Sequence, residues 1–298
     1  LGIDMNTKEY DIVIITALQK EMDNVRLAFD IYQKKCAKEY GHEENSWIDV
    51  PELNDVNSYK AIKIRNSDNQ SVSIISASAK KMGLTTASVL STKMILKFKP
   101  KVIVMLGICA GNTNEKIKYG DILVVDKSFD YQAGKVIMIE DKEVFKPDYD
   151  VLSLDSTYFD RFSENGEKWT YDISQKWRDA GKTKMPDPDL HVGVFGSGAA
   201  VMANNKVFAD IESHARKIIG LDMEAYAVFV AAERTISRNK PKALVIKAVQ
   251  DYADDSKAGL TPEQQAEVSK YTEYGSFASA TFFIHACEDF LISEIRSS

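Results

Sequence analysis

The sequence has 298 residues, 44% of them hydrophobic, and can bury a large core as one domain. Its formal net charge of −6 at pH 7 argues against a general nucleic-acid partner, because such surfaces are basic. No apolar run approaches the roughly 18 residues of a membrane span, and no signal peptide opens the sequence, so we expect a cytoplasmic protein with no membrane partner.

The side chains that usually bind metals are not grouped in the sequence. The four histidines are scattered, and the three cysteines lack metal-ligand spacing. Such widely spaced cysteines (Cys36, Cys109 and Cys287) fit a reducing compartment better than a disulfide framework. We therefore expect neither a metal site nor a cofactor.

The N-terminal part of the chain predicts a strand, a helix and a hairpin. Residues 10–16 are mostly β-branched, which is typical of a central strand. An amphipathic helix follows and runs to about Tyr32. Residues 33–58 are polar and look like an insertion, whereas 59–65 and 71–77 alternate as the two strands of a hairpin.

The next helix follows Gly83 and begins beside two lysines. Lys80 and Lys81 lie where a strand gives way to this helix, which ends before Pro100. Helix N-termini bind anions, so contact with a phosphate is one interpretation of the lysine pair. Exposure to solvent is the alternative.

The middle of the chain alternates strands with polar segments. Residues 102–111 are an apolar strand that runs into a small-residue turn, and a Gly-Asp turn precedes a strand at 122–125. The later segments are a strand at 135–140, a second polar insertion at about 140–189 with a helix near 152–180, a strand at 191–196 and a helix at 204–217.

The C-terminal part continues the alternation of strands and helices. A short buried strand at 218–221 leads into an apolar helix that begins at Ala225, and a second buried strand covers 243–249. A helix starts at Thr261, with proline at its first position, and residues 277–292 form a closing helix. This order predicts one α/β domain, a three-layer α/β/α sandwich around a twisted, mixed central sheet.

Glu224 is the first candidate site residue. It lies at the junction between a strand and a helix, where α/β proteins place ligand groups. A carboxylate there, with an apolar helix behind it, is costly unless it binds something. The alternative is that Glu224 only favours the helix N-terminus through the helix dipole.

Three segments, each preceded by an apolar strand, carry a resemblance to a known family. They are Gly107-Ile108-Cys109-Ala110-Gly111, Met223-Glu224-Ala225 and Gln250-Asp251-Tyr252-Ala253-Asp254. In this order they resemble the Gly-rich turn and the Met-Glu-Ala and Ser-Asp-x-Ala-Asp motifs of the nucleoside phosphorylase/nucleosidase superfamily, particularly the 5′-methylthioadenosine/S-adenosylhomocysteine nucleosidases. The resemblance runs from about Tyr10 to the C-terminal helix, apart from the two insertions.

The resemblance implies an enzyme that breaks the N-glycosidic bond of a purine nucleoside or nucleotide. Asp251 matches the family's acid, which protonates the leaving base at N7. Glu21 matches a glutamate that holds the attacking water; a glutamate exposed on the first turn of a helix is the alternative. Glu224 would hold the ribose hydroxyls, and Met223 would pack under the sugar.

The resemblance extends to five smaller or apolar positions. Cys109, Ala110 and Gly111 would let the backbone approach the ligand, because large side chains would block it. Val201 and Met202 match residues that line the base, Val201 through packing and Met202 through a backbone hydrogen bond. We also expect a homo-oligomer, a dimer or larger.

Three residues depart from the family's pattern. Gln250 replaces the serine before the acid, and Val201 replaces an aromatic residue that stacks on adenine. Ile108 stands where phosphorolytic members use a hydroxyl group for phosphate, and the first strand-to-helix turn offers Lys20 but no arginine. Ile108 and the lack of an arginine favour water over phosphate as the nucleophile, with Glu21 as its base.

Two alternatives to hydrolysis stay open. One is a phosphorolytic purine nucleoside phosphorylase, and the other is a catalytically quiet nucleoside-sensing module on the same fold. Glu21, Glu224 and Asp251 together argue against a sensing module, since a binder needs no acid. The group on the 5′ carbon also stays open, because the insertions and the Lys80-Lys81 pair leave room for a phosphorylated substrate such as AMP or ATP. The resemblance also extends to phosphorylase-like domains of bacterial signalling and defence proteins.

Overall fold

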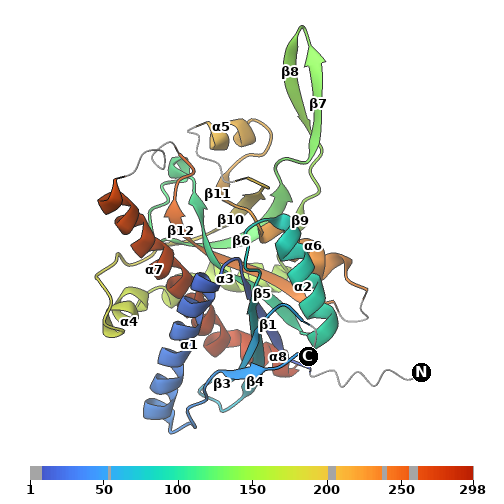
Figure 1. Cartoon of the computed structure of the whole chain (residues 1–298). Coiled ribbons are helices and arrows are strands. Elements are labelled where there is room, and N and C mark those ends of the chain that lie inside the picture. The colour runs from blue at the N-terminus through green and yellow to red at the C-terminus, as the bar shows by residue number, and fades with distance from the viewer. Residues whose placement is uncertain (1–8, 53–54, 201–205, 237–239, 255–260, 298) are drawn as a thin grey trace, which may run out of the picture.

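The computed structural model describes residues 9–52, 55–200, 206–236, 240–254 and 261–297 (Figure 1). Within them, helices cover both faces of one large mixed sheet, which confirms the predicted α/β class. The strands of this sheet are β1 Ile12–Thr16, β2 Ile48–Val50, β3 Tyr59–Arg65, β4 Ser71–Ser78, β5 Val102–Gly111, β6 Ile122–Asp130, β9 Leu152–Ser153, β10 Leu190–Ser197, β11 Ile218–Asp222 and β12 Lys242–Asp251.

The sheet has the order β11-β10-β6-β12-β5-β1-β4-β3-β2, and β9 pairs with β6. Its centre is parallel, since β5 pairs in this way with both β1 and β12. The pairs β12–β6 and β11–β5 are antiparallel, and the second of these joins the far edge of the sheet back to its centre. The carboxyl ends of β5, β11 and β12 therefore lie close together.

The helices of the two outer layers are α1 Gln19–Tyr40, α2 Leu84–Phe98, α3 Ser156–Asn165, α4 Ile173–Asp179, α5 Val207–Glu212, α6 Ala225–Arg234, α7 Pro262–Ala286 and α8 Ile292–Ser297, with a π-helix at Cys287–Leu291 between the last two. None of the described helices combines the length and apolarity that crossing a membrane requires.

Successive residues of each central strand face two different cores, as the pleat of a β-strand requires. Ile12 and Ile14 of β1 pack with α1 and α7, whereas Val13 and Ile15 pack with α2 and α6. All five residues of β1 are buried, because both faces of the sheet are covered. The two helix layers thus hold the central strands, and with them the strand ends, in a fixed arrangement.

Helix α1 is longer than the sequence predicts, because it continues to Tyr40 through the first part of the segment 33–58. Cys36 is buried in the core beneath α7, and the Gln33 side-chain amide donates a hydrogen bond to Lys63 O at 2.8 Å. Gln33 interrupts the apolar pattern of the helix, so hydrophobic periodicity does not predict this extension. The rest of the segment contributes the edge strand β2.

The segment 140–189, predicted as a polar insertion, carries aromatic side chains into the main core. Phe162 of α3 stacks on Phe282 of α7 with ring centroids 5.9 Å apart, and Trp177 of α4 lies 5.1 Å from Phe277. The segment therefore covers the outer side of α7. Its first residues include β8 Lys142–Pro147, which pairs with the preceding β7 Gly134–Ile139 in a separate two-stranded sheet.

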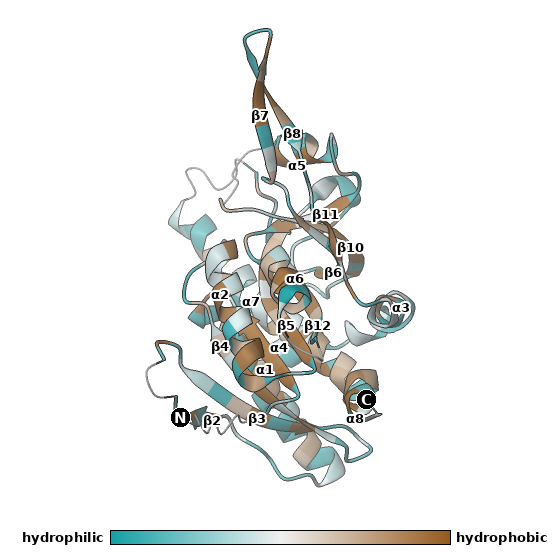
Figure 2. Cartoon of the chain, turned by 90° about the vertical axis from the view of Figure 1, so that its right-hand side faces the viewer, coloured by the Kyte–Doolittle hydropathy of each residue, from teal (hydrophilic) through white to brown (hydrophobic). Residues whose placement is uncertain are grey.

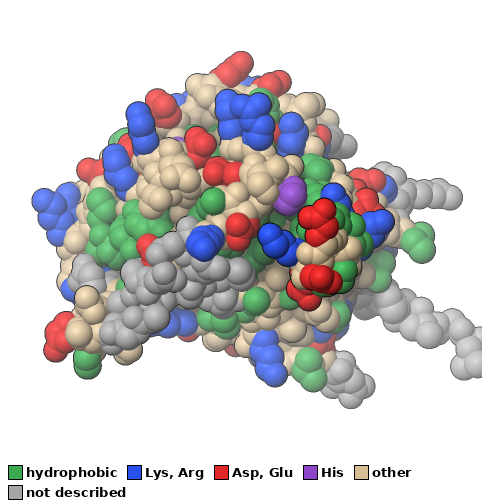
Figure 3. Space-filling view, turned by 90° about the horizontal axis from the view of Figure 1, so that it is seen from above, with side chains coloured by type: hydrophobic (Ala, Val, Ile, Leu, Met, Phe, Trp, Pro, Cys, Tyr) green, Lys and Arg blue, Asp and Glu red, His purple; other side chains and the backbone are tan. Residues whose placement is uncertain are grey.

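The β7–β8 hairpin extends away from the body of the molecule (Figures 1 and 2). Val136 and Met138 of β7 are more than half exposed, and Figure 2 colours much of this strand as hydrophobic. Seen from the hairpin side, lysine and arginine side chains are interspersed with aspartate and glutamate side chains over the described part of that face (Figure 3).

A glycine in α7 sets how closely this helix approaches the sheet. A β-carbon at Gly275 would lie 2.9 Å from Ile108 Cγ2 and 3.3 Å from Ala248 Cβ. The helix therefore packs directly on the ends of β5 and β12 because Gly275 has no side chain.

We expect Gly275→Val to lower the free energy of unfolding by about 1–3 kcal/mol, because the added side chain overpacks this contact. The matched control is Ser269→Val, at an exposed position of the same helix, with an expected change within about 0.5 kcal/mol. Urea unfolding measures both. Equal stabilities of the two variants would show that the α7–sheet contact tolerates a larger residue.

Candidate active site

One cavity of about 330 Å³ lies at the carboxyl ends of β1, β5, β11 and β12, the edge of the sheet where α/β proteins bind ligands. Its described lining has four carboxylates and no lysine or arginine. The lining residues are Ala17, Leu18, Glu21, Met82, Ile108, Cys109, Ala110, Tyr131, Ala200, Leu221, Asp222, Met223, Glu224, Gln250, Asp251, Ala253 and Thr272.

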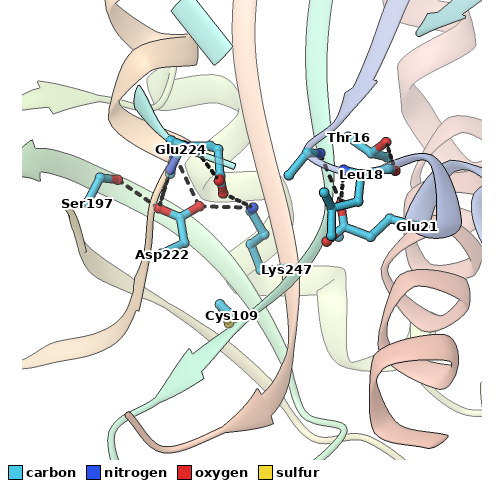
Figure 4. Close-up of polar contacts among 12 residues, drawn as sticks. Thr16, Leu18, Glu21, Cys109, Ser197, Asp222, Glu224 and Lys247 are labelled. Carbon is cyan, nitrogen blue, oxygen red and sulfur yellow. Dashed lines mark hydrogen bonds and ion pairs between the residues drawn. The ribbon is translucent and has the colours of Figure 1, made fainter. Parts of the chain in front are cut away.

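A buried lysine lies behind this acidic wall. Lys247 of β12 is 1% exposed, and its Nζ is 2.9 Å from Asp222 Oδ2 and 3.5 Å from Glu224 Oε2 (Figure 4). Burial alone would lower the pKa of Lys247, but the surrounding carboxylates raise it above its ordinary value. The ammonium group therefore stays charged and binds β11, the start of α6 and β12 together.

Asp222 organises the junction between β11 and α6. Its Oδ1 accepts hydrogen bonds from the Ser197 hydroxyl at 2.8 Å and from the backbone amides of Glu224 and Ala225 at 3.1 and 3.0 Å. A carboxylate that accepts from the first amides of a helix is a favourable N-terminal cap. Asp222 thus supplies the helix-capping role, which leaves the Glu224 side chain for another task.

Glu224 is held through both of its carboxylate oxygens. The carboxylate is buried, with Oε1 accepting from the backbone amide of Gly83 at 2.9 Å and Oε2 facing Lys247. Gly83 has φ of +118°, a conformation that favours glycine. Burial raises the pKa of Glu224, and the Lys247 charge opposes that rise.

Glu21 is buried at the first turn of α1, not exposed there. Its Oε2 accepts hydrogen bonds from the backbone amides of Ala17 at 2.9 Å and Leu18 at 3.1 Å. A β-carbon at Gly107 of β5 would lie 3.4 Å from the Glu21 carboxyl carbon, so this carboxyl group packs on bare backbone. Burial raises the pKa of Glu21 to about 7, although the charge of Lys247 opposes the rise.

Asp251 ends β12 and is 7% exposed. Its Oδ1 accepts from the backbone amide of Ala253 at 2.9 Å, and its Oδ2 accepts from Gln250 Nε2 at 2.8 Å. The residue that replaces the family's serine is therefore a hydrogen-bond partner of the Asp251 carboxyl group.

The structure brings Cys109, Ala110 and Met223 to the cavity as well. Gly111 follows in β5 but faces the core, where a β-carbon would lie 2.8 Å from Ile117 and 2.9 Å from Val249. Its lack of a side chain serves packing there. Val201 and Met202 lie outside the described residues; Ala200, which precedes them in the sequence, lines the cavity.

The lysine pair at the start of α2 does not line the cavity. Lys80 Nζ donates a hydrogen bond to Val56 O at 2.6 Å, and Lys81 is exposed. The residues that the sequence analysis missed are Lys247, Asp222 and Gly83. A lysine within the apolar strand 242–251 was the available signal, because a lysine is almost never fully buried without a partner.

Comparison with known proteins identifies the family of this chain. The family model of the phosphorylase superfamily matches residues 11–275. The uncharacterized protein y4jS of Sinorhizobium fredii is 33% identical over 222 residues, which are 73% of this chain and 50% of that protein. The ATP nucleosidase Cap17 of Escherichia coli is 23% identical over 259 residues, 83% of this chain and 46% of that protein.

Among solved structures, the 5′-methylthioadenosine/S-adenosylhomocysteine nucleosidase of Helicobacter pylori has the same fold. Its TM-score is 0.62 at 14% identity, over 95% of this chain and 99% of that one. The chain spans about half the length of the curated relatives named above. Because the family model covers most of its length, the chain belongs to the phosphorylase superfamily.

Proposed function

We propose that this chain is a purine nucleoside or nucleotide N-ribohydrolase, which uses water to release the free base. The observation that carries the proposal is one cavity lined by Glu21, Glu224 and Asp251, which come from three separate segments. Relatives named ATP nucleosidase support a nucleotide as one substrate class. A sensing module would need Glu224 to hold ribose, but neither a base nor an acid.

In this proposal Asp251 gives its proton to N7 of the purine while the electron pair of the C1′–N9 bond moves to the base. Protonation makes the base a better leaving group. Glu224 binds the ribose 2′- and 3′-hydroxyls, and Met223 packs under the sugar. The sugar then carries the positive charge of a ribosyl cation-like transition state.

The charges behind the cavity suit such a cation. The charges of Asp222 and Lys247 cancel. Glu224 therefore gives this cluster of three residues a net negative charge, which faces the proposed position of the sugar. Electrostatic stabilisation of a charge that develops in the transition state often contributes more to catalysis than any other effect. Lys247 also fixes the Glu224 carboxylate in place without neutralising the whole site.

Glu21 is the base for the attacking water. The two backbone amides hold its Oε2, so Oε1 is the oxygen that would bind water and take its proton as the oxygen attacks C1′. A pKa near 7 suits this role, because a base is most effective when its pKa is near the working pH. After the reaction Glu21 releases its proton to solvent, and Asp251 takes up a proton from solvent.

A phosphate nucleophile is disfavoured by the described part of the cavity. Phosphate would face Glu21 and the Ile108 side chain, and the described lining offers no lysine or arginine. Lys20 already pairs with Glu273 at 3.1 Å. A buried dianion without paired donors is costly, whereas a water molecule carries no such cost.

An assay of base release tests the proposal directly. The substrates are adenosine, methylthioadenosine, inosine, AMP and ATP, each with and without added phosphate. We expect free base with ribose, or with a ribose phosphate from a nucleotide, at a rate that does not depend on phosphate. Ribose 1-phosphate as the main product, with a rate that saturates in phosphate, would contradict the proposal.

The pKa of Glu21 predicts a pH profile. We expect kcat/KM to fall as the pH drops through about 7, because a protonated Glu21 cannot take a proton from water. Glu21→Gln should lose this acid limb together with most of the activity, by roughly 10²–10⁴-fold. The control is Glu39→Gln, at an exposed position of the same helix. A Glu21→Gln enzyme with an unchanged profile would remove Glu21 from the mechanism.

A further inference from the structure

Gln250 connects the proposed acid to helix α7. Its Nε2 donates to Asp251 Oδ2 at 2.8 Å, and its Oε1 accepts from the Thr272 hydroxyl at 2.5 Å. Thr272 Oγ1 also lies 3.2 Å from Val268 O, which is a second acceptor for the same hydroxyl proton. A chain of polar groups thus runs from a backbone carbonyl of α7 to the carboxyl group of Asp251.

The hydrogen bonds between these groups can form in two ways. The oxygen and nitrogen of a side-chain amide have nearly the same shape, so a half-turn of the amide exchanges them. With Asp251 ionised, the amide donates to the carboxylate and accepts from Thr272. With Asp251 protonated, the acid donates to Oε1 of the turned amide, whose Nε2 donates to Thr272 Oγ1, and the hydroxyl donates to Val268 O.

Both arrangements give a partner to the Asp251 carboxyl group, the Gln250 side-chain oxygen and the Thr272 hydroxyl. The backbone amide of Ala253 stays on Asp251 Oδ1 in each, so only the Oδ2 side changes. An unsatisfied polar group in such a site costs about 1–3 kcal/mol, and here neither protonation state incurs that cost. Gln250 therefore has the geometry to hold the acid before and after it gives up its proton.

We propose that Gln250 and Thr272 are positioning residues that hold Asp251 in both of its protonation states through reversal of the Gln250 amide. The inference rests on the proposed role of Asp251. Substrate binding turns the Asp251 O–H from Gln250 Oε1 to purine N7. When this proton moves to N7 and the C1′–N9 electron pair goes to the base, the amide returns to its first orientation and donates Nε2–H to the new carboxylate. Protonation of Asp251 from solvent turns the amide again.

Gln250 also differs from a residue that would form a hydrogen bond with Asp251 alone. A hydroxyl at position 250 could serve both forms of Asp251 by rotation, but it would not reach α7. The amide links the acid to Thr272, one turn from the close contact of α7 with the sheet at Gly275. Loss of the Thr272 hydroxyl should therefore affect a residue that it does not touch.

Two kinds of substrate separate this role from a general effect on the pocket. The best purine substrate of the panel needs a proton on its leaving group, whereas 4-nitrophenyl β-D-ribofuranoside has a leaving group that departs as the anion. We expect Thr272→Val and Gln250→Met to lower kcat on the purine substrate by about 10–100-fold, the value of a hydrogen bond to an ionised group. The loss on the nitrophenyl riboside should be much smaller.

Thr272→Ser is the matched variant, because it keeps the hydroxyl and should restore most of the purine activity that Thr272→Val loses. Asp251→Asn reports on the proposed function itself and should show the same selective loss, of roughly 10²–10⁴-fold. The Asp251→Asn variant can show the selective loss while the Gln250 and Thr272 variants lose activity equally on both substrates, or lose none. That result would overturn the positioning role of Gln250 and Thr272 and leave the acid assignment intact. An Asp251→Asn enzyme that keeps its purine activity would overturn the acid assignment.

Discussion

The interaction of Lys247 with Asp222 and Glu224 is the constraint around which the cavity is arranged. An ammonium group at the centre of a covered sheet is expensive unless carboxylates surround it, and each carboxylate here comes from the same strand–helix junction. Asp222 uses its other oxygen to cap α6, and Glu224 uses its other oxygen on the amide of Gly83. One buried charge therefore fixes β12, β11 and the starts of α2 and α6 relative to one another.

The same cluster explains why two glutamates in one cavity can do different work. Glu224 faces Lys247 and is held from both sides, which suits a group that binds the sugar (Figure 4). Glu21 lies on the other side of Lys247, with a pKa near 7 and only one oxygen held by backbone. The cavity thus holds one carboxylate fixed by an ion pair and one carboxyl group with a free oxygen that can accept a proton.

Much of the fold was predictable from the sequence, because buried parallel strands appear as unbroken apolar runs. Apolar runs predict the strands 10–16, 102–111, 218–221 and 243–249, and the motifs after the last two point to Glu224 and Asp251. The burial of Glu21 could not be predicted, since it depends on Gly107, which is distant in the sequence. The partners of Lys247 were hidden for the same reason: periodicity shows that a residue is buried but not which residue it meets.

The central claim is that Lys247 is a paired charge on which the cavity depends. A double-mutant cycle of Lys247→Met and Asp222→Asn, followed by urea unfolding, tests it most directly, with Lys242→Met as a control on the same strand at a partly exposed ion pair. We expect Lys247→Met to lower the free energy of unfolding by about 3–5 kcal/mol, the double variant to regain much of that loss, and the control to change it by about 0–1 kcal/mol. A Lys247→Met protein as stable as the control would contradict the account.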